Sequence, residues 1–397
     1  MQTVIELKHR KSCSCELIDS SPIWNAVSDL IKRAGCDAGF VHLCVDGANG
    51  VALSLNENCD SQVRTDMQHA LEHIIREDVP SAETLRAALV GCSIAVPFEK
   101  AHRGFITGTW QGIYLCDFRT GEARNSAVRV IVTVVKSAPL RTFKFDPPSR
   151  GSHDVSSHVQ RALQVPADAA SSGGALYLAF LKHTSVSIGC STLDGVAARI
   201  EPTLNVIVPE RWNREFFTHT YEGPDDMPAH VKCSLVGAGI ILPTSDASCK
   251  PLLCEHRDSG GWGGGPRSCI VSTASAPAVQ RVVDVGCVDG VIAVGDKIKE
   301  AVRECGAGDG AGLANVLCVC SAGDVSLVQV ERTEAGADML RPLQAALNIA
   351  GTTPSAAATV LGISVTLPLP LTPSEVYAVH MEKGPSKPCK LVISVIH

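Results

Sequence analysis

The chain has 397 residues, of which 45% are hydrophobic and 19% charged, the composition of a globular protein that buries a core. Its formal net charge of −6 argues against a nucleic-acid partner, which usually shows as a basic face. No apolar stretch approaches the roughly 20 residues that cross a bilayer and the N-terminus has no apolar secretory segment, so we expect a cytoplasmic protein without a membrane partner, whose 17 cysteines are free thiols.

The predicted elements recur three times in the same order along the chain. Each round opens with a strand, a polar turn and an amphipathic helix, and the spacing of apolar residues predicts these helices over Ile23–Ala34, Val155–Leu163 and Val291–Val302. A Gly-containing loop and a short apolar run follow each helix, and the runs GFVHLCV, ALYLAFL and NVLCVC indicate buried strands. A further strand and a helix come next, for example Asp60–Glu72 and Asp338–Leu347.

Each round then ends in the same way. The strand-and-turn segments are GCSIAVPF, GAGIILPT and GISVTLPL, and the last strands are VRVIVTVV, SCIVSTAS and CKLVISVI. Landmarks that recur in one order about 130 residues apart indicate internal triplication of a domain-sized element. We therefore predict three tandem units, residues 1–138, 139–277 and 278–397, which are called the first, second and third unit below. The predicted fold class is α+β, with a mixed or antiparallel sheet and helices on one face in each unit.

Four polar blocks are divided between the first two units without duplication. The first unit carries LNENCDSQVRTDM (Leu55–Met67) and GTWQGIYLCDFR (Gly108–Arg119). The second carries LKHTSVS (Leu181–Ser187) and THTYEGPDDMPAH (Thr218–His230). The third unit carries none of them, which suggests one site assembled from two thirds of the chain.

These four blocks together resemble the YjbQ-like family, also called the secondary thiamine-phosphate synthase family. The resemblance is close over the first two units and rests on strand and helix landmarks alone over residues 279–397. Family members are single units that assemble as homotrimers, so the resemblance implies a trimer fused into one monomeric polypeptide with pseudo-threefold symmetry. In the family one unit holds all four blocks. Here Ala48 stands where the first unit would have the histidine of HTSxS, and Ser191, Thr192 and Leu193 replace NEN in the second.

Three histidines of the second unit are candidate metal ligands. His183 ends an apolar strand, while His219 and His230 flank an acidic loop. Three imidazoles that meet at one point can hold a divalent ion such as zinc and leave a position open for water or substrate. The resemblance supports this interpretation, because all three positions belong to the family blocks. The alternative is that they are ordinary histidines bonded to the backbone, since the chain has 13 histidines.

Glu222, Asp225 and Asp226, in the loop between two of these histidines, are candidate catalytic residues. A carboxyl group crowded by others has a raised pKa and can act as an acid or base near neutral pH. The alternative is a Gly-Pro turn with solvated acids, in which Pro224 fixes the turn.

The NEN triplet and the arginine after it are candidate substrate-binding residues. Asn56 and Asn58 would share one face of a strand, with Glu57 on the other. Arg64 could present its fork to a phosphate. The alternatives are that Asn58 or Asp60 caps the following helix and that Arg64 forms an ordinary ion pair with Asp60.

The GTWQG block offers a second part of a substrate pocket. Its glycines allow close approach of the backbone, Trp110 has a flat apolar surface and Gln111 can both donate and accept. That set suits a flat heteroaromatic ligand, although a Trp packed between units is the alternative. Thr184 and Ser185 of HTSxS complete the predicted substrate-binding residues.

Sites in homotrimers commonly lie in clefts between copies. If the family site takes HTSxS and the acidic-histidine block from one unit and NEN and GTWQG from its neighbour, this chain keeps one complete site. That prediction fails if Asn56 and Trp110 lie far from His183, His219 and His230.

The resemblance implies a transferase-type activity that joins a pyrimidine diphosphate to a thiazole phosphate, and a small phosphorylated molecule or anion as the partner. A metal-dependent hydrolase of a phosphate or ester is one alternative, and a non-enzymatic binding or scaffold protein is another. The Gly-rich stretches 260–266 and 306–312 lack the strand–loop–helix context of a phosphate loop, so no nucleotide or flavin cofactor is expected.

Overall fold

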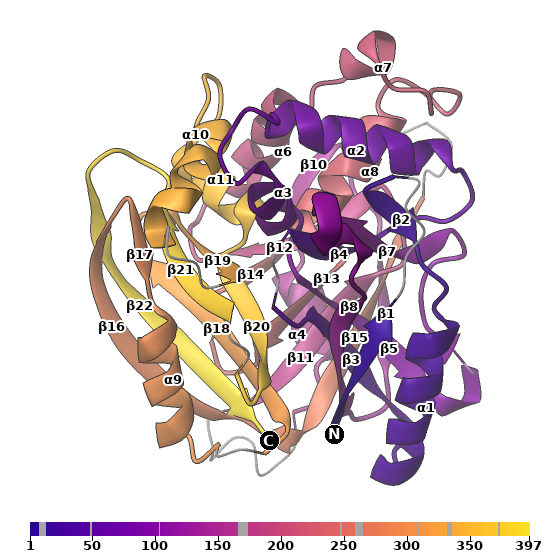
Figure 1. Cartoon of the computed structure of the whole chain (residues 1–397). Helices are drawn as coiled ribbons and strands as arrows, with labels where there is room; N and C mark the ends of the chain where they lie inside the picture. The colour runs from indigo at the N-terminus through magenta and orange to yellow at the C-terminus, as the bar shows by residue number, and fades with distance from the viewer. Residues whose placement is uncertain are drawn as a thin grey trace.

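The computed structural model of the chain describes all but a few short segments (Figure 1). The described residues are 1–7, 13–47, 50–102, 104–165, 174–246, 248–258, 265–307, 310–331, 336–371 and 374–397. Ala48, most of the Gly-rich stretch 260–266 and two residues of the stretch 306–312 lie outside them. All 17 cysteines are described, and each is a free thiol.

The first unit contains eight strands and three α-helices among its described residues. They are β1 (Gln2–Leu7), β2 (Cys15–Leu17), α1 (Ser21–Ala34), β3 (Ala38–Val45), β4 (Val51–Glu57), α2 (Gln62–Ile74), α3 (Ala82–Val90), β5 (Ser93–Glu99), β6 (Gly104–Phe105), β7 (Gln111–Asp117) and β8 (Val128–Lys136). Two short 3-10 helices cover Lys100–His102 and Gly121–Asn125.

The second and third units follow the same plan. The second contains β9 (Arg141–Phe145), β10 (Gly151–Asp154), α4 (Ser156–Ala162), β11 (Ala175–Leu181), β12 (Val186–Ser191), α6 (Ala197–Ile207), α7 (Trp212–Glu215), α8 (Asp226–Val236), β13 (Gly239–Pro243), β14 (Lys250–Glu255) and β15 (Arg267–Pro277). The third contains β16 (Val279–Asp289), β17 (Val291–Ala293), α9 (Gly295–Glu304), β18 (Gly312–Cys320), β19 (Val325–Glu331), a 3-10 helix (Gly336–Leu340), α10 (Arg341–Leu347), α11 (Pro354–Leu361), β20 (Ser364–Leu369), β21 (Ser374–His380) and β22 (Pro385–Ile396).

The sheets repeat one strand order three times. The larger sheets run β1-β8-β3-β5-β6, β9-β15-β11-β13 and β16-β22-β18-β20, and the smaller ones run β2-β7-β4, β10-β14-β12 and β17-β21-β19. In each larger sheet the first strand of the unit lies beside its last, and in each smaller sheet the second strand lies beside the next to last. The described pairs are antiparallel, for example β3 with β8 and β11 with β15. The sheets are thus antiparallel and not mixed.

Helix α1 shows why the periodic pattern predicted most elements correctly. Its buried residues are Ile23, Val27, Leu30 and Ile31, which form one stripe on a helix of 3.6 residues per turn. The helix ends at Gly35, whose φ of 57° lies in the left-handed region that closes helices and favours glycine.

The helix predicted over Val291–Val302 is wrong in its first residues. Val291–Ala293 form strand β17, which pairs with β21, and helix α9 begins at Gly295. The apolar residues of this segment fit both the helical and the strand period. The segment forms a strand because β21 offers backbone partners and because β-branched side chains pack well in a sheet.

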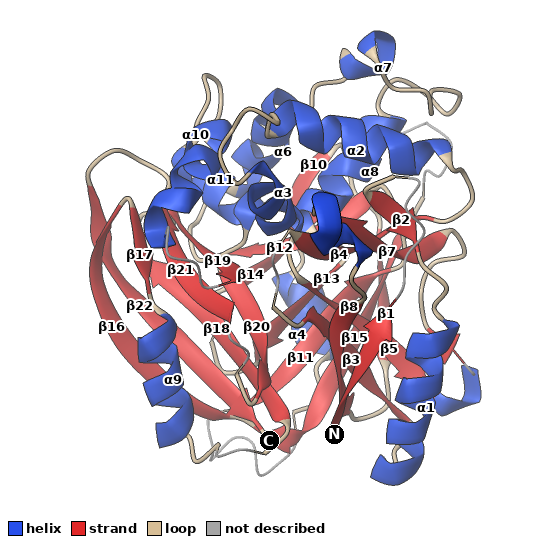
Figure 2. Cartoon of the chain, in the orientation of Figure 1, coloured by secondary structure: helices blue, strands red, loops and turns tan. Residues whose placement is uncertain are grey.

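The three units share their interior. One cluster of buried side chains includes Tyr114 of the first unit, Leu235 of the second and Ala357 of the third. Only Ala278 separates β15 from β16, so the second and third units are joined almost strand to strand. In Figure 2 the helices α2, α3, α6, α8, α10 and α11 gather at one end of the molecule, over the sheets. Among the described helices, none is both long and apolar enough to span a membrane.

Candidate functional site

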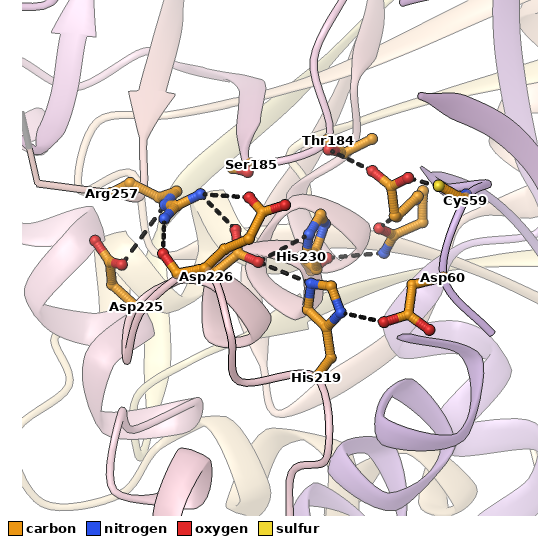
Figure 3. Close-up of polar contacts among 12 residues, drawn as sticks. Cys59, Asp60, Thr184, Ser185, His219, Asp225, Asp226, His230 and Arg257 are labelled. Carbon is orange, nitrogen blue, oxygen red and sulfur yellow. Dashed lines mark hydrogen bonds and ion pairs between the residues drawn. The ribbon is translucent and has the colours of Figure 1, made fainter. Parts of the chain in front are cut away.

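Three buried polar side chains meet at the N-terminal end of α8 (Figure 3). Asp226 is the first residue of α8 and His230 lies one turn later, so the two side chains share a face of the helix. His219 comes from the segment between α7 and α8. Their potential ligand atoms all lie within 4.8 Å of one another, and each residue is at most 3% exposed. We call these three residues the His–Asp–His cluster.

The ring of His219 lies between two carboxylates. Its Nδ1 is 2.7 Å from Oδ2 of Asp60, and its Nε2 is 2.8 Å from Oδ2 of Asp226. Burial alone would lower the pKa of His219, but the hydrogen bonds to Asp226 and Asp60 outweigh it and raise the pKa to about 9. The ring is therefore an imidazolium at neutral pH unless a metal ion takes the place of a proton.

His230 has one ring nitrogen near Asp226 and one without a protein partner. Its Nε2 is 3.6 Å from Oδ2 of Asp226. Its Nδ1 is buried and, among the described residues, has no hydrogen-bond partner. A buried polar atom left in this way costs about 1–3 kcal/mol. The other nitrogen, Nε2, is the one that faces Asp226 and His219.

A buried arginine holds the acidic loop in place. Nη1 of Arg257 donates to Oδ1 of Asp226 at 2.6 Å, and Nη2 donates to the carbonyl of Glu222 at 2.6 Å. Nε of Arg257 lies 3.5 Å from Oδ1 of Asp225. Asp225 and Asp226 are buried, so the alternative of a turn with solvated acids is wrong for these two, while the side chain of Glu222 stays 36% exposed. Burial would raise the pKa of Asp226, but its hydrogen bonds from His219 and His230 hold it far below the usual range.

A buried ionic network supports the strand end that carries Arg257. Glu201 of α6 accepts hydrogen bonds from Lys232 at 2.8 Å, from Arg150 at 2.9 Å and from Nδ1 of His256 at 2.7 Å. Burial would raise the pKa of Glu201, but the charges and hydrogen bonds of His256 and Lys232 keep it well below the usual range. Since His256 directly precedes Arg257, this network fixes the backbone from which the guanidinium reaches the acidic loop.

Two amide side chains of the first unit bind the second unit at and beside this cluster. Nδ2 of Asn56 donates to the carbonyl of His230 at 2.9 Å and to Oγ of Ser234 at 2.8 Å. Nε2 of Gln111 donates to the carbonyls of Leu181 at 3.0 Å and His183 at 2.6 Å. Both amides are used up by these contacts, so their geometry supports positioning of the second unit's strands and helix.

The GTWQG loop packs on the end of β11. Nδ2 of Asn58 donates to the carbonyl of Gln111 at 3.2 Å, and the backbone N–H of Asn58 donates to the carbonyl of Trp110 at 2.7 Å. A side-chain carbon at Gly108 would lie 2.7 Å from the carbonyl oxygen of Lys182, so only glycine permits this close approach. Trp110 is 58% exposed on this loop, which differs from the alternative of a tryptophan packed between units.

Glu57 is a second carboxyl group, after Asp60, that the first unit places near the histidines. Its Oε1 accepts from the N–H of Cys59 at 2.9 Å, and its Oε2 lies 3.5 Å from Oγ1 of Thr184. Burial raises the pKa of Glu57, and the charges of His230 and His219 act on it in the opposite direction. The structure therefore brings Glu57 and Thr184 from two units to the edge of the cluster.

His183 lies beside the His–Asp–His cluster but is not one of its three members. Its Nδ1 accepts a hydrogen bond from the N–H of Ser185 at 3.1 Å, which leaves the other nitrogen to carry the proton of the neutral ring. Burial, followed by the charge of Arg267, lowers the pKa of His183 to about 3, so the ring is neutral at pH 7. The sequence predicts His183 as the third metal ligand beside His219 and His230. In the structure Asp226, which was predicted as an acid or base, takes that third position.

Arg64 lies in the first turn of helix α2, near Tyr114. Its charge acts on Tyr114, whose hydroxyl donates to the carbonyl of Glu57. Among the described residues Arg64 makes no ion pair with Asp60, because Asp60 is bound to His219 instead. Nε of Arg64 is buried without a hydrogen-bond partner in the described part of the chain. In the part of the chain that the structure describes, no hydrogen bond or ion pair joins Arg64 to the cluster.

Sequence reasoning missed three residues of the site. They are Asp60, for which the sequence predicts only a helix cap or an ion-pair partner, Asp66 and Arg257. Asp66 of α2 accepts from the N–H groups of Thr218 and His219, both at 2.8 Å, and so fixes the segment that carries His219. Asp66 lies in the VRTDM part of the first block, which is a signal for it in the sequence. Arg257 ends the segment CEHR (Cys254–Arg257), which aligns with CDFR (Cys116–Arg119) of the first unit, and this match is the signal for Arg257.

The charges of the site do not balance. Its carboxyl groups are those of Glu57, Asp60, Glu222, Asp225 and Asp226. The cations opposite them are Arg257 and the imidazolium of His219. The surplus is negative, so the site is suited to a cation, and an anion would bind there only together with one.

Comparisons with known proteins match more than half of this chain to one family. The model of the family described as UPF0047 protein YjbQ-like matches residues 6–136 and 141–251, more than half of the chain. UPF0047 protein YjbQ of Escherichia coli O157:H7 is 32% identical over 129 residues, 30% of this chain and 89% of that protein. UPF0047 protein YugU of Bacillus subtilis is 28% identical over 127 residues, 29% of this chain and 89% of that protein.

Among solved structures, an uncharacterised conserved protein of the YjbQ/UPF0047 family from Clostridium acetobutylicum covers 34% of this chain and 99% of its own, at 21% identity and a TM-score of 0.27. Each of these relatives therefore matches about a third of this chain with nearly its whole length.

Proposed function

This chain belongs to the YjbQ-like UPF0047 family, and we propose that it is a single-chain pseudo-trimer with one functional site between its first and second units. We propose that this site binds a divalent metal ion, with zinc as the first candidate, and a small phosphorylated molecule. The observation that carries this proposal is the buried His–Asp–His cluster of the second unit, to which Asp60 and Asn56 of the first unit bind directly. Beside it, Glu57 and Gln111 of the first unit bind Thr184 and the carbonyl of His183.

The recurring strand order supports the pseudo-trimer. Each unit contributes one larger and one smaller antiparallel sheet with the same sequence of neighbours, and a family relative matches the length of one unit. The third unit then completes the pseudo-trimer without family blocks, and the chain is a monomer in solution. Light scattering coupled to gel filtration would distinguish this monomer from a trimer of about 125 kDa.

The donor set suits a divalent ion such as zinc. Two atoms that are each about 2.0–2.2 Å from one zinc ion lie roughly 3–3.5 Å apart, and Oδ2 of Asp226 is 2.8 Å from Nε2 of His219 and 3.6 Å from Nε2 of His230. Asp60 holds the other nitrogen of His219, as carboxylates commonly hold metal-ligating histidines. When bound, the ion supplies positive charge to a phosphate or diphosphate group.

The residues around the cluster supply the remaining chemistry of a transferase. In the reaction that the family resemblance suggests, a carbon–nitrogen bond forms between the pyrimidine and thiazole parts while the carbon–oxygen bond to the diphosphate breaks and pyrophosphate leaves. The guanidinium of Arg257, anchored by Asp226, lies where it can attract the leaving group. Trp110, exposed on the neighbouring loop, offers a flat surface to a heteroaromatic ring.

A phosphate or ester hydrolase is the second candidate, and Glu57 favours it. The buried carboxyl of Glu57, whose pKa is raised by burial and whose Oε2 lies 3.5 Å from Oγ1 of Thr184, can take a proton from an attacking water. Product analysis separates the two reactions, since a hydrolase releases phosphate or an alcohol from a single substrate and a transferase needs two.

Metal content and ligand binding of purified protein test the proposal. We expect Asp226→Asn, which keeps the side-chain volume, to remove one zinc ion per chain and the zinc-dependent binding of inorganic pyrophosphate. Asp60→Asn, at a side chain that is 18% exposed, should weaken both without disturbing the fold. The matched control is His102→Ala, at an exposed histidine outside the site. Zinc and pyrophosphate binding equal to wild type in both Asp variants would leave the scaffold interpretation standing.

A further inference from the structure

The third unit carries a histidine–carboxylate group of its own, at the ends of β19 and β21. The potential ligand atoms of Asp324, His380 and Glu382 all lie within 4.8 Å of one another. Asp324 and His380 are buried, at 6% and 2% exposure, while Glu382 is exposed to solvent. None of the four family blocks contributes to this group.

The group lies at the strand ends that correspond to those bordering the proposed site in the second unit. In the second unit Val186 of β12 pairs with Glu255 of β14, and in the third Val325 of β19 pairs with His380 of β21. These are the corresponding strands of the two smaller sheets.

Counted from these pairs, Asp324 stands where the second unit has Ser185, and Glu382 stands where it has Arg257. The third unit has therefore exchanged a serine and an arginine for two carboxyl groups.

The same position faces the neighbouring unit. A side-chain carbon at Gly323 would lie 2.9 Å from Cβ of Leu193, so the loop before Asp324 packs directly on the second unit. Leu193 follows Ser191 at the end of β12 as Asn58 follows Asn56 at the end of β4. The group of the third unit thus lies at the contact between units that corresponds to the proposed site.

The hydrogen bonds of His380 leave a nitrogen directed at a carboxylate. Nδ1 lies 2.8 Å from the carbonyl of Gly384 and must carry a proton to donate to it. In the neutral ring Nε2 then has a lone pair, and it faces Oδ2 of Asp324 at 3.1 Å. Two acceptors at that distance need a cation between them, either a second ring proton or a metal ion. Two atoms each about 2.1 Å from one ion are roughly 3–3.5 Å apart, so the spacing fits a metal.

The segment that carries His380 is held in place independently of Glu382. The N–H of Met381 donates to the carbonyl of Asp324 at 2.9 Å, and Nδ2 of Asn348 donates to the carbonyl of Met381 at 2.9 Å. The side chain of Gln344 donates to the carbonyl of His380. A ligand pair fixed by its surroundings loses little freedom when it binds an ion, which favours affinity.

We propose that Asp324, His380 and Glu382 form a second divalent-metal site, at the contact between the third and second units. One imidazole and two carboxylates suit zinc or manganese better than magnesium. The exposed Glu382 leaves the outer side open to water or to an anionic ligand. This site does not depend on the His–Asp–His cluster, so each can exist without the other.

Zinc titration of the full-length chain by calorimetry, with cobalt absorption as a second readout, tests the proposal. Wild type should bind two zinc ions per chain and Asp226→Asn one. In the Asp226→Asn protein, Glu382→Gln should weaken the remaining binding at least tenfold, and His380→Ala should abolish it. Glu304→Gln changes an exposed acid of the same unit and should have no effect.

Because Glu382 is exposed, Glu382→Gln should leave the melting temperature of the metal-free protein unchanged, which separates lost ligation from lost folding. Zinc binding by the Asp226→Asn protein that Glu382→Gln does not weaken, or no zinc binding by that protein at all, would overturn the second site. If wild type binds a single ion that Glu382→Gln weakens and Asp226→Asn does not, the second site stands and the first fails.

Discussion

The side-chain hydrogen bonds of Asn56 and Gln111 to the second unit, called the clamp below, can be broken at Asn56. This side chain is fully buried, donates to the carbonyl of His230 and to Ser234, and accepts from the N–H of Glu57 at 2.7 Å. The variant Asn56→Ala removes all three hydrogen bonds. At about 1 kcal/mol net for each bond, with a further penalty for buried groups left without a partner, we expect a loss of about 3–5 kcal/mol in the free energy of unfolding.

The same change should disturb the site. Asn56 holds the backbone of His230, and residues that orient a metal ligand typically change metal affinity by about 10- to 100-fold when they are lost. Asn56→Ala should therefore weaken zinc binding at the first site at least tenfold, while the cluster itself keeps all its side chains.

Urea unfolding followed by circular dichroism gives the stability, and zinc calorimetry gives the affinity. Ser191→Ala is the matched control, because Ser191 holds the corresponding position of β12. Among the described residues its hydroxyl bonds only with the backbone of Leu193. We expect this control to cost about 1 kcal/mol. If Asn56→Ala costs no more than Ser191→Ala and leaves the zinc affinity unchanged, the clamp does not position the site.

Three further changes test other parts of the structure. Burial lowers the pKa of His42 from 6.5 to about 4, so folding favours the neutral ring, and the stability of wild type should fall as the pH drops from about 6.5 to 4, by up to about 3 kcal/mol. His42→Asn should flatten urea-unfolding stability across that range, and an unchanged slope would contradict the assignment. Lys232→Met leaves the buried Glu201 without one of its cations and should cost on the order of 3 kcal/mol in urea unfolding, whereas a neutral effect would show the network to be replaceable. Trp110→Ala removes an exposed ring and should change stability by less than about 0.5 kcal/mol while weakening calorimetric binding of thiamine phosphate about three- to tenfold; equal binding would remove Trp110 from the site.

The local spacing of apolar residues predicted most of the helices and strands correctly. The stripe of Ile23, Val27, Leu30 and Ile31 has one helical interpretation, and the all-apolar Ala175–Leu181 is too short for most helices. Val291 and Ile292 show the limit, because apolar residues at the start of an amphipathic pattern extend a helix or form a strand depending on the partner that tertiary structure offers.

Part of the candidate site was likewise predictable from local sequence, and part was not. His219, Asp226 and His230 come from one block of sequence, and α8 brings two of them to one face. The contact of His219 with Asp60 joins residues 159 positions apart and has no local signal. Asn56 and Gln111 were predicted to bind substrate, since an amide in a loop or strand end suits either a ligand or a backbone carbonyl. Only the approach of the second unit shows that both amides are bonded to its backbone.

Anomalous diffraction from crystals grown with zinc tests the proposed site most directly. Data collected on the two sides of the zinc absorption edge locate the ion without reference to activity. We predict a zinc peak between Nε2 of His219, Oδ2 of Asp226 and Nε2 of His230, on the border of the first and second units. A map without a peak at this position, from crystals that contain zinc in excess, would contradict a metal site there.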